Sequence, residues 1–167
     1  MAAPQISYDV DGSNAISSVL TTLMNQFPGL GTRNILFSTM DNTAAGIGFF
    51  PTSGAAILSE TEDITGHVTQ MCLYPFTIVY RSSPKTDTQR IKIKEFLDAL
   101  VRWLCREPVK IGQNTHTLSA YPALTVGNRV IKAISQTGPA HLNGAYADGV
   151  EDWTISGTLR YEHQFDK

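Results

Sequence analysis

The chain carries, at residues 74–81, the run Tyr74-Pro75-Phe76-Thr77-Ile78-Val79-Tyr80-Arg81, and a turn of two serines, a proline and a lysine follows it. β-Branched and aromatic residues are typical of strands. The next segment opens at Thr86-x-x-Gln89, a capping box in which each side chain satisfies a free backbone donor of a helix start. The sequence therefore predicts a strand over residues 66–81, a helix over residues 87–106, and packing of that helix on a sheet.

The predicted strand 66–81 has one apolar face. Its even-numbered positions carry Val68, Cys72, Tyr74, Phe76, Ile78 and Tyr80. Successive side chains of a strand point to opposite faces, so these six are expected in the core. Pro75 lacks a backbone donor, which favours an edge position or a bulge at that point.

The predicted helix 87–106 has a buried and a charged face. The expected core positions are Ile93, Phe96, Leu97, Leu100, Trp103 and Leu104. The expected outward positions are Arg90, Lys92, Lys94, Asp98 and Arg102. Asp98 and Arg102 have the i, i+4 spacing that allows an ion pair.

A second helix is predicted over residues 14–27, with Ser13 as its cap. Apolar residues recur in it with helical periodicity, while the opposite face bears short neutral side chains only. Such a face is cheaper to desolvate than a charged one. Two interpretations stay open, namely an exposed face poor in charge or a contact with another subunit, for which Ser17, Thr21 and Asn25 are the candidates.

Further strands are predicted at residues 34–40, 46–50, 55–59, 115–121, 129–135 and 151–162. In the last of these, Trp153, Ile155, Leu159 and Tyr161 alternate with polar residues, which indicates one core face and one polar face. Residues 136–149 are expected to form a long loop, and such loops are often functional. Leu142 and Tyr146 in this loop are further interface candidates. The fold class is therefore α+β, a mixed and mostly antiparallel sheet with two main helices packed on it, in a single domain with residues 1–12 as an N-terminal arm.

Composition narrows the function classes. The chain has 167 residues, 42% of them hydrophobic, 17% charged, and a net charge of −2. That balance argues against nucleic-acid binding through bulk positive charge. Cys72 and Cys105 are not in a metal-binding spacing and are expected to be free thiols in a reducing compartment. We expect no signal peptide and no membrane-spanning segment.

No catalytic motif is apparent in the sequence. The four histidines, His67, His116, His141 and His163, have no second ligand at helical or hairpin spacing, so no metal site and no cofactor are predicted. Gly29 and Gly31 follow a helix, whereas a phosphate loop follows a strand. The acidic groups at residues 60–63 and 151–152 are expected to be solvated.

Two segments resemble tailed-phage minor capsid or tail-completion proteins of the tail-terminator group, from phages with long non-contractile tails. The first comprises residues 74–81 together with the helix pattern Ile93-Lys94-Glu95-Phe96-Leu97-Asp98-Ala99-Leu100-x-x-Trp103-Leu104. The second is Gly149-Val150-Glu151-Asp152-Trp153 leading into Leu159-Arg160-Tyr161-Glu162. The order of predicted elements also fits over most of the chain.

The resemblance implies a small α/β protein that assembles as a homo-oligomeric ring, commonly a hexamer. Such a ring sits on the head-proximal end of the tail tube, stops its polymerisation and provides the head-joining interface. Implied partners are other copies of the chain, the tail tube protein and a head-completion or connector protein. DNA would pass through the lumen without sequence-specific binding. The implied location is the virion, at the head–tail junction, after synthesis in the bacterial host cytoplasm, and no enzymatic step is implied.

Two alternatives remain open at this stage. One is a head-completion (stopper) subunit of the same connector region. The other is a small α+β enzyme or ligand-binding domain with a pocket between the long helix and the sheet, which would require converging titratable groups.

Overall fold

The computed structural model describes residues 13–40, 45–52, 56–124 and 128–167. The predicted arm 1–12 lies outside them. The elements are α1 (Ser13–Met24), β1 (Ile35–Phe37), β2 (Gly46–Pro51), β3 (Ala56–Glu62), β4 (His67–Ser82), α2 (Asp87–Leu104), β5 (Val109–Ile111), β6 (Asn114–His116), β7 (Arg129–Gln136), β8 (His141–Ala145) and β9 (Glu151–Asp166). The predicted α+β class, with a mixed and mostly antiparallel sheet and two helices, is confirmed.

The two longest strands form the centre of a seven-stranded sheet. β4 and β9 pair antiparallel over their full length, from His67 opposite Asp166 to Ser82 opposite Glu151. On the outer side of β4, β2 pairs with its C-terminal half and β3 with its N-terminal half. On the outer side of β9, β8 pairs with its N-terminal part and β7 with its C-terminal part. β1 extends the sheet by a parallel pairing with β2.

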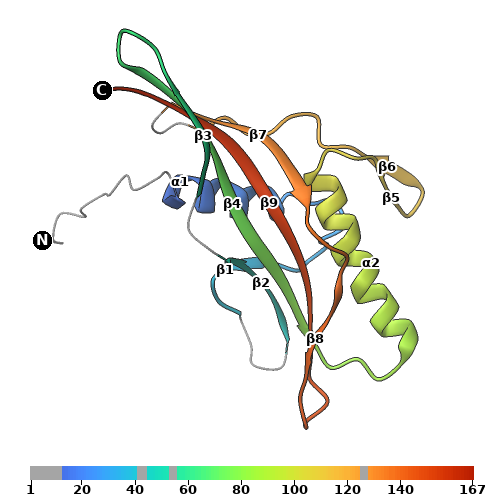
Figure 1. Cartoon of the computed structure of the whole chain (residues 1–167). Helices are drawn as coiled ribbons and strands as arrows, with labels where there is room; N and C mark the ends of the chain where they lie inside the picture. The colour runs from blue at the N-terminus through green and yellow to red at the C-terminus, as the bar shows by residue number, and fades with distance from the viewer. Residues whose placement is uncertain (1–12, 41–44, 53–55, 125–127) are drawn as a thin grey trace, which may run out of the picture.

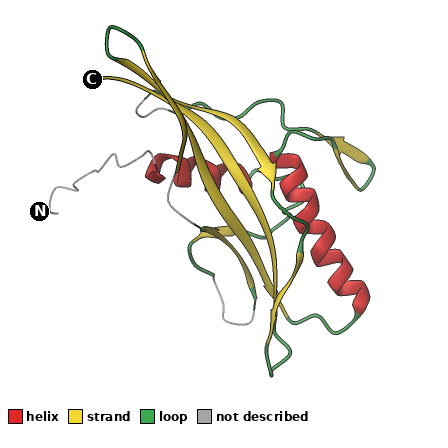
Figure 2. Cartoon of the chain, in the orientation of Figure 1, coloured by secondary structure: helices red, strands yellow, loops and turns green. Residues whose placement is uncertain are grey.

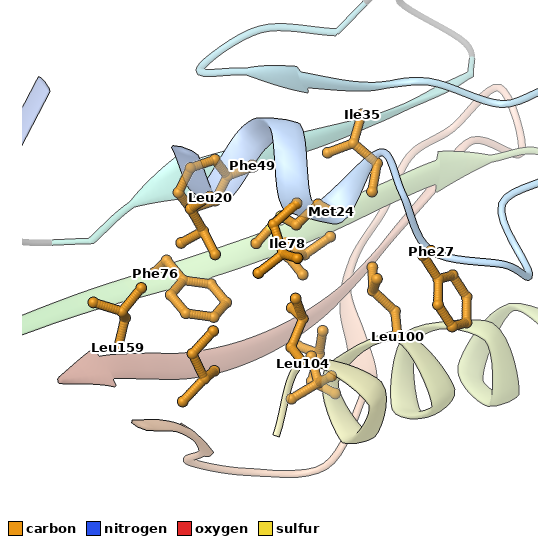
Figure 3. Packing of buried hydrophobic residues seen from close by; sticks show 14 of the residues in the cluster. Leu20, Met24, Phe27, Ile35, Phe49, Phe76, Ile78, Leu100, Leu104 and Leu159 are labelled. Atoms are coloured by element: carbon orange, nitrogen blue, oxygen red, sulfur yellow. The ribbon is translucent and has the colours of Figure 1, made fainter. Parts of the chain in front are cut away.

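Both helices pack on one face of this sheet (Figures 1 and 2). The even-numbered residues of β4 and the odd-numbered residues of β9 point to them, as the alternation predicted. Figure 3 shows Leu20, Met24 and Phe27 of the α1 region meeting Phe76 and Ile78 of β4 and Leu100 and Leu104 of α2. The helix start is also as predicted, since the Thr86 hydroxyl accepts from the Gln89 amide at 3.3 Å and the Gln89 side chain accepts from the Lys85 amide at 2.6 Å.

The expectation that Pro75 marks an edge or a bulge is confirmed only in part, since β4 is an interior strand without a bulge at Pro75, but neither β2 nor β3 pairs with this residue. Pro75 lies in the interior of the sheet, opposite Thr158 of β9, and the β4–β9 register continues through it without a shift. The Pro75 carbonyl accepts from the amide of Thr52, just beyond β2. In an antiparallel strand the N–H and C=O of one residue point to the same side, so the missing donor of Pro75 faces the gap between β2 and β3, where it deprives no ladder of a bond.

The predicted loop 136–149 contains a strand. β8 (His141–Ala145) pairs with β9 through a register shift between Leu142 and Gly144. The glycines and the proline of this stretch hid it, because they weaken the strand pattern that sequence periodicity detects. Conversely, the strand predicted over residues 115–121 is reduced to β6, which pairs only with β5, and residues 117–121 form no strand.

The ion pair expected within α2 has a different partner. Asp98 accepts from the Lys94 ammonium at 2.7 Å, four residues earlier, instead of pairing with Arg102. Its other carboxylate oxygen accepts from the backbone amide of Ala140 at 3.1 Å. Asp98 therefore fastens the segment before β8 to the helix.

Candidate interaction surfaces

The neutral face of α1 is only partly available to another molecule. Ser17 retains 7% of its exposure and its hydroxyl bonds to the hydroxyl of Tyr74, so the expectation that it lies on the outward face is wrong. Thr21 is half-buried and its hydroxyl donates to the Ser17 carbonyl at 2.7 Å. Sequence periodicity misplaced Ser17 because it stands at the border of the apolar stripe, where the hydroxyl of Tyr74 gives a polar side chain a buried partner.

Asn25 serves the chain's own sheet. Its side-chain amide donates to the Ile35 carbonyl at 2.9 Å and accepts from the Ile35 amide at 2.8 Å. These two bonds replace the backbone hydrogen bonds that a neighbouring strand would make to Ile35, and so cover the free edge of β1 at that residue. Among residues 15–27, for which the structure describes the exposure, the exposed ones are Ser18, Thr22 and Gln26.

Leu142 and Tyr146 lie together on the hairpin of β8 and β9. Leu142 is 43% exposed and Tyr146 is 52% exposed. The Tyr146 amide donates to the Val150 carbonyl at 2.8 Å, which closes the turn between the two strands. The structure does not bring this hairpin to the α1 candidates, because Tyr146 lies beside Arg81 whereas Ser17 contacts Tyr74, seven positions or roughly 23 Å earlier on β4.

The hairpin is anchored by two carboxylates that were expected to be solvated. Asp152 accepts two bonds from the Arg81 guanidinium at 2.7 and 2.8 Å and one from the Tyr146 hydroxyl at 3.0 Å. The bonds from Arg81 and Tyr146 hold the pKa of the Asp152 carboxyl below its usual value, against the opposing effect of burial. The expectation of solvation is therefore wrong for this residue, whose side chain is 9% exposed.

Glu151 is buried on the side of α2. It accepts from the Arg90 guanidinium at 2.9 Å and from the Trp153 indole at 3.3 Å. Arg90 thereby ties the start of α2 to the start of β9. No signal in the sequence identified these pairs, because the partners are 61 and 71 residues apart.

The hairpin of β3 and β4 exposes large apolar side chains. Ile57 is 56% exposed, Leu58 is 58% exposed and Ile64 at the turn is 104% exposed relative to the reference state. The register shift of β3 falls between Ile57 and Ser59, so Leu58 is the bulged residue. In Figure 1 this hairpin projects from the sheet beyond both helices.

The turn of this hairpin is held in one conformation. One oxygen of Asp63 accepts from the Thr65 amide at 2.8 Å, the Thr65 hydroxyl at 2.6 Å and the His67 amide at 3.0 Å. These bonds hold the pKa of the Asp63 carboxyl below its usual value. Gly66 has a φ of 85°, a left-handed conformation that glycine adopts without a Cβ penalty. Ile64 is thus presented on a rigid tip.

The tip of the β3–β4 hairpin is acidic. Its carboxylates are Glu60, Glu62 and Asp63, and Asp166 at the end of β9 lies opposite His67. Lys167 pairs with Glu62 at 2.6 Å and His67 with Asp166 at 2.7 Å, which raises the pKa of the His67 imidazole. No lysine or arginine of the described residues pairs with Glu60 or Asp63.

A groove lies at the opposite end of β4. It has a volume of about 320 Å³, and its lining includes the apolar side chains of Tyr80, Pro84 and Ile93 between two cations, Arg33 and Lys92. The Arg33 guanidinium stacks over the Phe96 ring at 4.4 Å and donates to the Tyr80 hydroxyl at 3.0 Å. In the part of the chain that is described, neither cation takes part in an ion pair.

The described residues contain no group of three metal-ligating side chains. Within the same residues, no helix combines the length and the apolar character that crossing a membrane requires. Cys72 and Cys105, the two cysteines of the chain, are not joined by a disulfide, in agreement with the predicted thiols.

Comparison with known proteins gives matches among solved structures only. No protein-family model matches the chain, and no curated protein matches it. Among solved structures, a chain from the virion of a native gene transfer agent particle aligns with a TM-score of 0.48 at 9% sequence identity. The alignment covers 93% of this chain and 99% of that chain.

Proposed function

We propose that this chain is a structural protein of a phage-like virion and, within it, a tail terminator. In this role it forms a ring, expected to be a hexamer, on the head-proximal end of the tail tube. The ring stops tube polymerisation and offers the surface to which the head connector joins. The proposal starts from the resemblance of residues 74–104 and 149–162 to that group, and a property of the sheet supports it.

The supporting observation is the length of the central strand pair. β4 and β9 each have 16 residues, or about 50 Å at 3.3 Å per residue. A compact domain of 167 residues would be about 40 Å across. The ends of the pair therefore extend beyond the body, and one end carries the exposed Ile57, Leu58 and Ile64. Exposed apolar groups on a projecting element are typical of surfaces that bind other proteins.

The face of the sheet turned away from the helices supports the same role. No helix of the described chain covers it (Figure 2). Five of its central positions are neutral and half-buried, namely Leu73, Thr77, Val79, Ser156 and Thr158, and the exposed Arg160 lies opposite Leu73. The neutral positions lose little hydration energy when another protein covers them. Capping and docking need such surfaces and no covalent step.

The two alternatives differ in what they require. A head-completion subunit would use the same surfaces on the connector instead of the tube. An enzyme would need a pocket between α2 and the sheet, and in the described residues that space holds core side chains such as Leu97, Leu100 and Leu104, all 0% exposed.

Electron microscopy of the purified protein with and without tail tubes tests the proposal. A terminator is expected to appear as a ring on one end of each tube and to halt elongation when tube subunits are added. Binding to isolated connectors without any binding to tubes would instead favour the head-completion role. A protein that binds neither structure would contradict both.

A further inference from the structure

We infer that the tip of the β3–β4 hairpin of one copy docks into the Arg33–Lys92 groove of the next copy, with Ile64 as the inserted side chain. The inference deepens the proposed function, on which it rests, by naming the contact between ring subunits. The occupant is a second copy of this chain. Three properties of the two surfaces carry it.

The first property is complementary charge. The hairpin tip carries Glu60 and Asp63, which have no lysine or arginine partner among the described residues. The groove carries Arg33 and Lys92, which likewise take part in none of the ion pairs found there. The acidic side chains already accept hydrogen bonds within their own chain, Glu60 from the Gln70 amide at 2.6 Å and Asp63 from Thr65 and His67, but they have no cationic lysine or arginine partner there. The two sets are opposite in charge, and complementary charge steers association and suppresses wrong partners.

The second property is a matching apolar contact. Ile64 is fully exposed at the tip, a costly position for a large apolar side chain. The floor of the groove between its two cations consists of the half-buried Tyr80 and the buried Pro84 and Ile93. The turn around Ile64 is already fixed by the bonds to Asp63, so docking orders few additional groups, and a preorganised element binds with less loss of entropy.

The third property is distance. The hairpin tip precedes His67 at one end of β4 and the groove adjoins Ser82 at the other end. Sixteen residues of strand separate them by about 50 Å, so one chain cannot fill its own groove. A patch at one end of a subunit that fits a different patch at the far end is a heterologous contact, and repetition of such a contact gives a closed ring when the rotation closes.

Cysteine cross-linking tests the contact directly. The full chain with Ile64→Cys is mixed with the full chain carrying Ser83→Cys, a residue that lines the groove, at the concentration where rings form on tubes. A disulfide between the two chains is expected under mild oxidation. The matched control replaces Ser83→Cys by Thr22→Cys, an exposed position on α1, and is expected to give no heterodimer.

Charge exchange provides the second measurement. Lys92→Glu is expected to weaken association about tenfold or more, and Glu60→Lys in the partner is expected to restore much of it, because the pair is then exchanged in sign. Lys110→Glu, an exposed lysine on β5, is the control and should leave association unchanged. Ile64→Ser is expected to weaken association about 10- to 100-fold through lost apolar burial.

The outcomes separate this contact from the proposed role. Rings on tube ends without the 64–83 disulfide and without rescue by charge exchange would overturn the contact and leave the terminator role standing. The disulfide and the rescue in a protein that never binds tubes would support the contact and contradict the terminator role.

Discussion

The hydroxyl of Ser17 on α1 and the hydroxyl of Tyr74 on β4 form a hydrogen bond in the interior of the protein. Tyr74 has no exposed surface, and burial raises the pKa of its phenol above the usual value. The bond joins the first helix to the middle of the central strand. Ser17 therefore contributes to the stability of the fold, although a serine at this point of the helical pattern is expected on the surface.

Removal of the Ser17 hydroxyl is expected to destabilise the protein. Ser17→Ala deprives a buried Tyr74 hydroxyl of its partner, which should cost about 1–3 kcal/mol in the free energy of unfolding. The double variant Ser17→Ala/Tyr74→Phe removes both polar groups and should be more stable than the sum of the single changes predicts, as measured by urea unfolding. Ser18→Ala, on the exposed side of α1, should change stability by less than about 0.5 kcal/mol. Additive single changes would show that the bond contributes nothing.

The same bond determines which α1 variants can report on assembly. Ser17→Glu would place a carboxylate in the core and is expected to unfold the protein, so a loss of rings in that variant would say nothing about an interface. Thr22→Glu changes an exposed position of the same helix. If α1 contributes to a subunit contact, Thr22→Glu should weaken ring formation while the melting temperature stays the same.

The elements of the fold could be predicted because local periodicity encodes them. The period of two in β4 and β9 and the period of 3.6 in the helices identified which residues face the core, and the capping box at Thr86 located the start of α2. β8 escaped because a five-residue strand broken by a register shift has no clear period. The position of Pro75 in an interior strand was not predicted, because the effect of a proline depends on which neighbour its backbone faces, and that is a property of the sheet.

The candidate surfaces could be predicted only in part. Leu142 and Tyr146 were predicted as interface candidates of one segment, and both are exposed. The anchoring of that segment by Arg81 and Arg90 was missed, since cross-strand and helix-to-strand pairs follow from the register of distant segments. The exposure of Ile64 likewise depends on the projection of the hairpin beyond the body, which no local pattern specifies. Whether Ser17, Thr21, Asn25, Leu142 and Tyr146 contact a partner stays a prediction.

Loss of the Arg81 guanidinium should destabilise the fold and the β8–β9 hairpin together. In Arg81→Ala the Asp152 carboxylate, 9% exposed, loses its two charged bonds. Breaking a buried ion pair from one side costs about 3–5 kcal/mol, and the lower end is expected because the Arg81 side chain is itself 26% exposed. Urea unfolding measures the total, and hydrogen exchange of the Tyr146 amide reports on the hairpin.

A more exposed ion pair provides the matched control. Lys132 and Glu162 are 3.7 Å apart, with side chains 40% and 20% exposed. Pairs of this kind contribute about 0–1 kcal/mol, so Lys132→Ala should leave both readouts nearly unchanged. Equal losses of unfolding free energy in Arg81→Ala and Lys132→Ala would mean that the buried Arg81–Asp152 pair stabilises the protein no more than the exposed pair does.

The Asp152 carboxyl should make stability depend on pH in the acid range. Its pKa is lowered in the folded state, chiefly by the bonds from Arg81, so its contribution is fully present above the unfolded value of about 3.9. That contribution is lost as the pH falls through the lower folded pKa, because protonation then removes the ion pair. The unfolding free energy of the wild type should therefore fall more steeply below about pH 4 than that of Asp152→Asn. Glu95→Gln removes an exposed carboxylate of α2 and should keep the wild-type slope; parallel curves for wild type and Asp152→Asn would contradict the assignment.

Trp103 should be among the largest single contributors to the packing of α2 on the rest of the core. It is 5% exposed, and its ring centroid lies 5.6 Å from that of Phe27, beyond the end of α1. Trp103→Ala creates a cavity between the two helices and should cost about 3–5 kcal/mol, which corresponds to a Tm lower by roughly 10 °C in a chain of this size. Val130→Ala, at a position 52% exposed on the edge strand β7, serves as the control and should change stability by less than about 0.5 kcal/mol. An unaltered Tm in Trp103→Ala would show that the contact between α1 and α2 does not depend on this ring, and the packing shown in Figure 3 would then have to be carried by Leu100 and Leu104 instead.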